Sequence, residues 1–255
     1  MKRIGMLFFL WSVVMSGHIQ AQKINDFEIA LGVNQGYLKD YKFSPLHYKE
    51  TGALLSMEYS RRKVAGKSIL TAKLDAGIDY LNSDVADYLK SNVWDFDLEV
   101  AYLRKLEAST KFDLFVGGQY HTRVNFIDFG GLNGFSWLFA HTLDIKARAE
   151  YQLPNNQSLS SSLSIPVVGL LNRPGYNIYD KEILEAFEER FIQFIFTGDV
   201  GSVNKYVAFD WETKYRRPLT KKMDLAITYG LAYQRVTDDT QFTHLQNQLR
   251  VGIIF

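Results

Sequence analysis

The 255-residue chain contains no cysteine and only five prolines. The absence of cysteine excludes a disulfide framework and any metal site built on thiolates. Neither sign of charge dominates, because 29 basic residues face 28 acidic ones and the formal net charge is +1. Proteins that bind nucleic acids carry a clear excess of basic residues, so we expect no nucleic-acid partner.

The first 21 residues have the features of a secretory signal peptide. Lys2 and Arg3 form a short positive region, residues 4–15 are largely apolar, and Ala21 suits the last position before cleavage. We therefore expect a signal peptide over residues 1–21 and one mature domain over residues 22–255. The alternative is an N-terminal membrane anchor, although the apolar core is short for a span of about 20 residues. No later segment reaches the roughly 18 uninterrupted apolar residues of a transmembrane helix.

The mature sequence alternates between apolar and polar residues with a period of two. Over residues 223–234, every odd position is apolar and every even position is small or polar. This alternation predicts a β-strand, because helical spacing would mix the two sets. Ten segments share the pattern: 27–33, 53–59, 70–80, 94–102, 112–124, 137–151, 159–167, 207–215, 223–234 and 245–255.

Two architectures produce such alternation. In a soluble β-sandwich the apolar face points at the core, and in a transmembrane barrel it points at lipid. The strands are longer than those of globular sheets, and long enough to cross a membrane. The connections alternate between short ones, such as 63–67 and 153–157, and mostly longer ones, such as 38–48 and 171–203. We therefore predict an all-β, antiparallel transmembrane barrel of about ten strands, with the short turns and both termini on the periplasmic side.

Aromatic residues at the ends of the apolar faces support the barrel, since such residues form girdles at the two membrane interfaces. The aromatic residues expected at one rim are Tyr37, Tyr80, Trp94, Phe126, Trp137 and Tyr233. Those expected at the other rim are Tyr59, Tyr102, Tyr151, Tyr215 and Phe255.

The end of the chain carries a further signal. Phe255 is preceded at alternate positions by Ile253, Val251 and Leu249. This pattern is similar to the C-terminal signal that outer-membrane proteins present to the barrel-assembly machinery, and the whole mature chain resembles a bacterial outer-membrane β-barrel protein. The resemblance implies a location in the bacterial outer membrane, with outer-membrane lipid and the assembly machinery as partners.

The longest connection, residues 173–203, contains an amphipathic pattern. Residues 180–196 place apolar side chains at near-helical spacing, with glutamates opposite, so we expect a helix within an outer loop. The alternative is an extra strand at residues 191–196, which would need another strand to restore an even number.

A ten-stranded barrel is narrow, so we expect its lumen to be largely filled by side chains. The inward side chains that we single out as lumen or ligand residues are Asp79, Asp95, Asp97, Glu99, His121, Arg123, Asp210, Glu212 and His244. Their mixed charges predict ion pairs across the lumen. We expect Arg123 and His121 to neutralise the negative charge of the acidic residues among them. A hard cation such as calcium is the alternative. No calcium-loop spacing is present, and we predict no resident metal or cofactor.

These features favour a monomeric, non-enzymatic barrel with a structural role, or one that binds an envelope protein or a small ligand at its outer loops. A hydrolase at the outer mouth is the second hypothesis. Asp95 and Asp97 are similar to the first Asp pair of the omptin-like proteases, with His121 as a further weak candidate. Their second, Asp–His pair is not visible, because Asp210 is followed two residues later by Glu212. A small porin is the third hypothesis.

Overall fold

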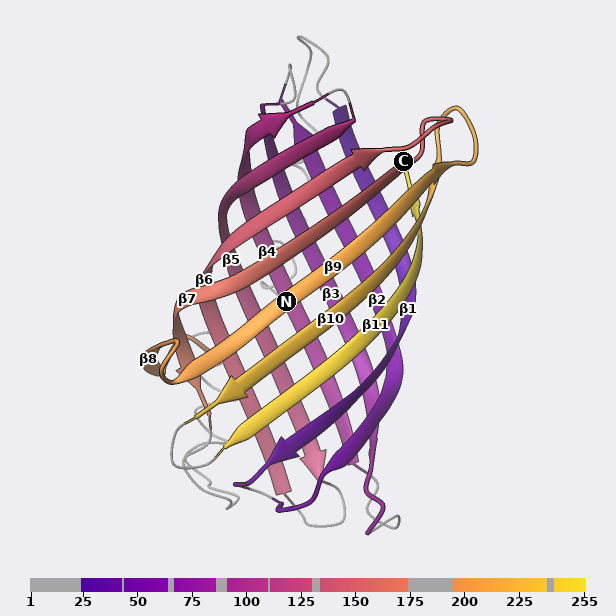
Figure 1. Ribbon diagram of the computed structural model, residues 1–255. Helices are drawn as coiled ribbons and strands as arrows, with labels where there is room; N and C mark the ends of the chain where they lie inside the picture. Colours follow the sequence, from indigo (N-terminus) through magenta and orange to yellow (C-terminus); the bar gives the residue numbers. More distant parts are fainter. Residues whose placement is uncertain are drawn as a thin grey trace, which may run out of the picture.

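The computed structural model describes residues 24–42, 44–63, 67–85, 91–109, 111–129, 134–173, 195–237 and 241–255. The described residues form eleven antiparallel strands (Figure 1). Their bounds are β1 (Ile24–Asp40), β2 (Tyr48–Arg62), β3 (Ser68–Asn82), β4 (Ser91–Ala108), β5 (Phe112–Phe129), β6 (Gly134–Gln152), β7 (Ser158–Asn172), β8 (Asp199–Ser202), β9 (Tyr206–Pro218), β10 (Asp224–Val236) and β11 (Phe242–Ile254). None of the described residues forms a helix long and apolar enough to cross a membrane.

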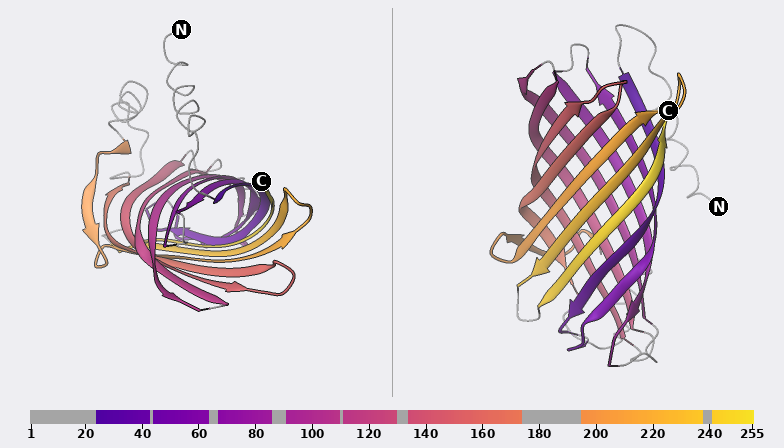
Figure 2. Two further views of the ribbon diagram at one scale, coloured as in Figure 1. Left: turned by 90° about the horizontal axis from the view of Figure 1, so that it is seen from above. Right: turned by 45° about the vertical axis from the view of Figure 1, so that its right-hand side comes forward.

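Ten of these strands close into a barrel. Consecutive strands pair from β1 through β7, β7 then pairs with β9, β9 with β10, and β10 with β11. Strand β11 pairs with β1 along thirteen residue pairs and completes the ring (Figure 2). The ten strands are 13 to 19 residues long, which exceeds the roughly 9–11 residues that a tilted strand needs to cross a membrane. Each of the ten predicted segments falls largely within one of them, so the predicted ten-stranded antiparallel barrel is confirmed.

The eleventh strand, β8, was not predicted. The inner part of β7 pairs with β9, whereas its outer part, from Val168 to Leu171, pairs with β8. The predicted helix over residues 180–196 and the rival strand at 191–196 lie outside the described residues, except for Ile195 and Phe196. These two residues lie against the barrel wall, where the Phe196 ring stacks on His141 at 4.5 Å and the His141 Nε2–H donates to the Ile195 carbonyl at 3.0 Å.

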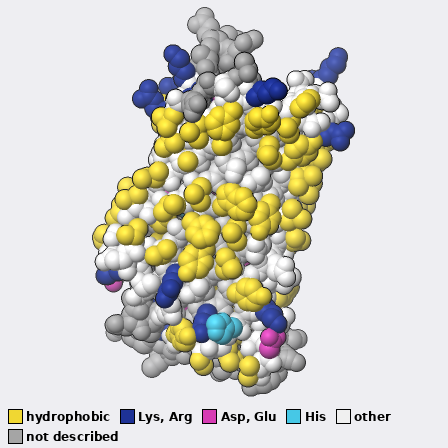
Figure 3. Space-filling model, in the orientation of Figure 1, with side chains coloured by type: hydrophobic (Ala, Val, Ile, Leu, Met, Phe, Trp, Pro, Cys, Tyr) yellow, Lys and Arg dark blue, Asp and Glu magenta, His cyan; other side chains and the backbone are white. Residues whose placement is uncertain are grey.

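The side chains of the barrel are arranged inside out relative to a soluble protein. Apolar side chains cover the outer wall, and Leu31, Val33 and Ile145 are 69%, 59% and 58% exposed. Charged side chains such as Glu50 and Asp79 point inward and are fully buried. Figure 3 shows hydrophobic side chains spread over the middle of one side of the wall, with lysine and arginine gathered near its two ends. The apolar faces therefore match a lipid environment.

Aromatic residues mark both rims of this apolar band. Trp94, Phe126 and Trp137 lie in register across β4, β5 and β6 toward one end. Toward the other end, Tyr102 and Tyr151 are 46% and 42% exposed. The positions match the two predicted girdles.

The two ends of the barrel differ in the length of their connections. The four turns after β2, β4, β6 and β9 are short, and the connections at the opposite end are mostly longer. Asn155 and Asn156, in the tight turn after β6, both adopt positive φ angles, 59° and 58°, which asparagine tolerates better than most residues. We call the short-turn end the inner end, because outer-membrane barrels keep short turns in the periplasm.

A charge placed on the middle of the lipid-facing wall is expected to destabilise the barrel. Ile145 lies about midway between Trp137 and Tyr151 on β6, so Ile145→Arg should lower the free energy of unfolding by about 2–4 kcal/mol. The control is Leu219→Arg in an inner turn, where the cost should fall to about 0–1 kcal/mol. Urea titration in lipid vesicles measures both values, and equal costs at the two positions would contradict the membrane placement.

Candidate functional site: the barrel lumen

An apolar cluster, here called the outer plug, fills the lumen at its outer end. Its thirteen members are buried side chains, with exposed fractions of 8% or less, and each of the ten barrel strands supplies at least one of them. They are Leu38, Tyr48, Leu81, Val93, Ile127, Phe129, Leu138, Ala140, Leu171, Tyr206, Ala208, Val236 and Phe242. Sequence reasoning missed the outer plug. The signal was present, because stretches such as residues 137–140 are apolar on both faces.

Directly beneath the outer plug lies a set of acidic and amide side chains, here called the acidic layer: Asn34, Glu50, Asp79, Asp95, His244 and Gln246. His244 Nε2 lies 2.5 Å from Glu50 Oε2. The Gln246 side-chain nitrogen lies 2.7 Å from Glu50 Oε1, 3.2 Å from Asp79 Oδ2 and 3.1 Å from Asp95 Oδ2. Asp79, Asp95 and His244 were predicted lumen residues, whereas Glu50 was missed because the alternating pattern on its strand was read only from residue 53.

The next layer is organised around Arg123. Its guanidinium donates to Asp97 at 3.0 Å and to Asp210 at 2.6 Å, and therefore links β4 to β9 across the lumen. His121 Nε2 lies 3.3 Å from Asp97, and its Nδ1 lies 3.7 Å from both Asp144 and Asp210. The structure thus brings Asp97, His121, Arg123 and Asp210 together.

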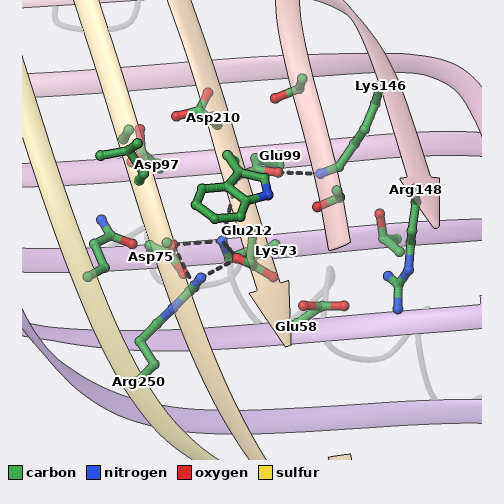
Figure 4. Close-up of a pocket in the computed structure, with 18 of the residues that line it drawn as sticks. Glu58, Lys73, Asp75, Asp97, Glu99, Lys146, Arg148, Asp210, Glu212 and Arg250 are labelled. Atoms are coloured by element: carbon green, nitrogen blue, oxygen red, sulfur yellow. Dashed lines mark hydrogen bonds and ion pairs between the residues drawn. The ribbon is translucent and has the colours of Figure 1, made fainter. Parts of the chain in front are cut away.

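At the centre of the lumen, lysine and arginine side chains lie among carboxylates (Figure 4). Lys73 Nζ lies 2.9 Å from Glu212 and 3.1 Å from Asp75, and Arg250 bonds to the same two carboxylates. On the other side, Lys146 donates to Glu99 at 2.9 Å. Glu99 and Glu212 therefore lie in a layer of ion pairs, separate from Asp79 and Asp95.

Toward the inner end the lumen widens into a vestibule. A cavity of about 530 Å³ is lined by the inner ends of the strands and by turn residues such as Asn156 and Lys221. Its charges are paired, for example Lys214 with Glu28 at 2.8 Å. The free space shrinks to about 50 Å³ at mid-lumen and about 10 Å³ beside Asp95 and His244. Serines at alternate positions of β7, such as Ser158 and Ser160, leave part of this space open.

Two of the weak catalytic candidates, Asp95 and Asp97, line the same cavity of about 10 Å³, and His121 lies beside Asp97. Asp95 belongs to the acidic layer, whereas Asp97 and His121 belong to the Arg123 layer. His121 is 4% exposed, and the Asp97 carboxylate accepts a hydrogen bond from Arg123. Neither His121 nor Asp97 therefore faces a space open to the outer medium.

The C-terminal residues lie on the lipid-facing wall. Leu249, Val251 and Phe255 are 50%, 52% and 56% exposed, and Ile253 pairs with Ile29 of β1. The backbone N–H of Phe255 donates to the Phe27 carbonyl at 2.9 Å, which joins the last strand to the first. Their role as an assembly signal stays a prediction.

Removing the cation from a lumen layer is expected to destabilise the barrel. Arg123→Met leaves two carboxylates, Asp97 and Asp210, without their guanidinium partner, so the free energy of unfolding should fall by about 3–5 kcal/mol. The control is Lys49→Met. Lys49 and Asp84 form an ion pair at the rim, where their side chains are 56% and 77% exposed, so its loss should change the free energy of unfolding very little. Urea titration in detergent micelles compares the two variants, and indifference to Arg123→Met would mean that the layer is hydrated rather than paired.

Comparison with known proteins identifies the fold but no family. No protein-family model and no curated protein sequence matches the chain. Among solved structures, the outer-membrane protease OmpT from Escherichia coli superposes with a TM-score of 0.62 at 8% identity, over 94% of this chain and 99% of that one. The translocator domain of the autotransporter NalP from Neisseria meningitidis gives 0.45 at 10% identity, covering 99% and 94%. An outer-membrane channel from Pseudomonas putida gives 0.43 at 10% identity, covering 94% and 98%.

At such low identities these similarities show the fold alone. That fold is the closed β-barrel of bacterial outer-membrane proteins, which confirms the resemblance in fold expected from the sequence.

Proposed function

We propose that the protein is a monomeric, non-enzymatic and non-conducting barrel that serves as a scaffold in the outer membrane and binds polar ligands or envelope partners at its two ends. The observation that carries this proposal is the outer plug. Buried apolar side chains from all ten barrel strands meet there, so the plug belongs to the barrel wall itself.

The lumen beneath the plug also argues against a pore. Water-filled channels belong to barrels of about 16–18 strands, whereas barrels of about eight strands are filled by side chains. This ten-stranded lumen narrows from about 530 Å³ of free space at the inner end to about 10 Å³ beside the acidic layer. Arg123 and Arg250 bridge carboxylates of different strands across the remaining width.

Binding is therefore assigned to the two ends of the barrel. The inner vestibule offers hydroxyl groups together with charges of both signs, which suit a small polar or zwitterionic ligand arriving from the periplasm. The outer rim presents polar and aromatic groups, where Lys39 donates to His47 at 2.8 Å and lies over the Tyr41 ring at 4.1 Å. Loops on a rigid scaffold are a common place for such contacts.

Planar lipid bilayers test the absence of conduction. The purified protein should insert without producing stable current steps, because the outer plug and the ion-paired layers leave no continuous water path. An unrelated porin inserted under the same conditions is the positive control. Regular steps from the wild-type barrel would overturn this proposal and favour the small porin.

The hydrolase hypothesis has one favourable contact, the 3.3 Å approach of His121 to Asp97. General-base catalysis also requires a substrate within hydrogen-bond reach, and the outer plug separates these residues from the outer medium. We expect Asp97→Ala and the matched variant Asp224→Ala to give the same background rate as the wild type on peptide and lipid ester substrates. A wild-type activity that is lost only in Asp97→Ala would restore the hydrolase hypothesis.

A further inference from the structure

Charges of the two signs are separated at the inner end of the barrel. Six acidic side chains that the structure describes there point inward, and each pairs with an inward lysine or arginine. They are Asp26, Glu28, Glu58, Asp113, Glu150 and Asp224. The negative charge of this end is therefore compensated inside the barrel, and does not balance the charges on its outside.

The outside of the same end carries positive charge. Three of the four short turns, those after β2, β4 and β9, supply seven basic side chains, here called the basic band: Arg61, Lys63, Lys67, Arg104, Lys111, Arg217 and Lys222. All are exposed except Arg61, which is half-buried, and none forms an ion pair with an acidic side chain that the structure describes. On the visible side in Figure 3, this end, at the top, shows lysine and arginine without aspartate or glutamate, whereas the opposite end shows both signs.

The three arginines of the basic band have a fixed relation to the aromatic girdle. Each follows a girdle tyrosine by two residues, in the pairs Tyr59–Arg61, Tyr102–Arg104 and Tyr215–Arg217. Residues two apart on a strand share a face and lie about 7 Å from one another, so each arginine points outward just beyond its tyrosine. The headgroup region on each side of a bilayer is roughly 5–7 Å thick. The guanidinium groups therefore lie at the level of the lipid phosphates.

The basic band surrounds the barrel and does not form a single patch. Strands β5, β6 and β7 separate Arg217 from Arg104 on one side, and β10, β11 and β1 separate it from Arg61 on the other. One protein partner would cover only part of this circumference, whereas lipid contacts all of it. The outer rim is different, because Lys39 contacts His47 there and Lys49 pairs with Asp84.

We propose that the basic band selects anionic phospholipids, such as phosphatidylglycerol, in the periplasmic leaflet. The planar guanidinium of each arginine can donate two hydrogen bonds to one phosphate. The turn lysines add attraction for a headgroup of net negative charge. A zwitterionic headgroup offers the same phosphate but also carries an ammonium group, which the band repels. This preference belongs to the lipid-facing wall and does not depend on any ligand in the vestibule.

Spin-labelled lipids measure the preference directly. The protein is refolded into phosphatidylcholine vesicles that contain a trace of phosphatidylglycerol or phosphatidylcholine labelled on an acyl chain. Electron paramagnetic resonance gives the motionally restricted fraction of each label, and thus its relative association constant at the barrel. Phosphatidylglycerol should associate about two- to fivefold more strongly. Raising the salt from about 0.1 M to 1 M should reduce this preference, because the Debye length falls from about 10 Å to about 3 Å.

A variant that combines Arg61→Gln, Arg104→Gln and Arg217→Gln removes the groups placed at the phosphate level. These side chains make no ion pair with the described acidic residues, so the variant should still fold, which circular dichroism checks. Its association constants for the two lipids should be nearly equal, because glutamine lacks the positive charge that distinguishes them.

The matched control removes the same number of positive charges from the outer rim. It combines Lys39→Gln, Lys49→Gln and Arg235→Gln, three positions near the outer ends of β1, β2 and β10. The control should keep most of the preference for phosphatidylglycerol, although its net charge equals that of the arginine variant.

Four results would overturn the proposal. The first is equal association of both lipids with the wild-type barrel, and the second is an unchanged preference in the arginine variant. The third is loss of the preference in the outer-rim control as well, since net charge alone would then attract the lipid. The fourth is binding of a soluble poly-glutamate peptide that requires the three arginines while the wild type shows no lipid preference, because the band would then fit an acidic protein.

Discussion

The structure depends on one constraint, which is that every backbone N–H and C=O group within a bilayer must find a partner in the protein. A sheet meets this constraint only when its first and last strands pair, as β1 and β11 do here from the Glu28–Ile254 pair to the Asp40–Phe242 pair. Closure then assigns two different surroundings to alternate side chains of every strand. The apolar set faces lipid, and the polar set faces an interior too narrow for bulk water.

The narrow interior explains the layers of the lumen. A charged side chain removed from water is stable only beside an opposite charge, so carboxylates and cations face one another across the barrel, as Arg123 does with Asp97 and Asp210. Toward the outer end lies the apolar plug, with the buried Asp40–Arg173 ion pair beside its member Phe242. Toward the inner end the serines of β7 leave space for a vestibule. The barrel is therefore closed outward and open inward, and the acidic layer lies where this change occurs.

The sequence alone predicts the strands, their polarity and the closure of the barrel, because a period of two assigns each residue to a face. It does not predict the register between strands, and register decides which inward groups meet. His121 has no carboxylate at neighbouring inward positions of its own strand, yet the pairing of β4 with β5 brings Asp97 to it. Glu50 lies beyond the part of its strand where alternation is clear, and the plug residues Ile127 and Leu138 follow aromatic residues, so both faces are apolar there.

Spin labels on single introduced cysteines test the central claim directly, since the natural chain has no cysteine of its own. A label at Val33 on the outer wall should collide with lipid-soluble oxygen and be shielded from a water-soluble nickel complex. A label at Ser160 in the vestibule should show the reverse. If the label at Val33 is instead reached by the nickel complex in intact vesicles, the apolar face does not contact lipid and the account is wrong.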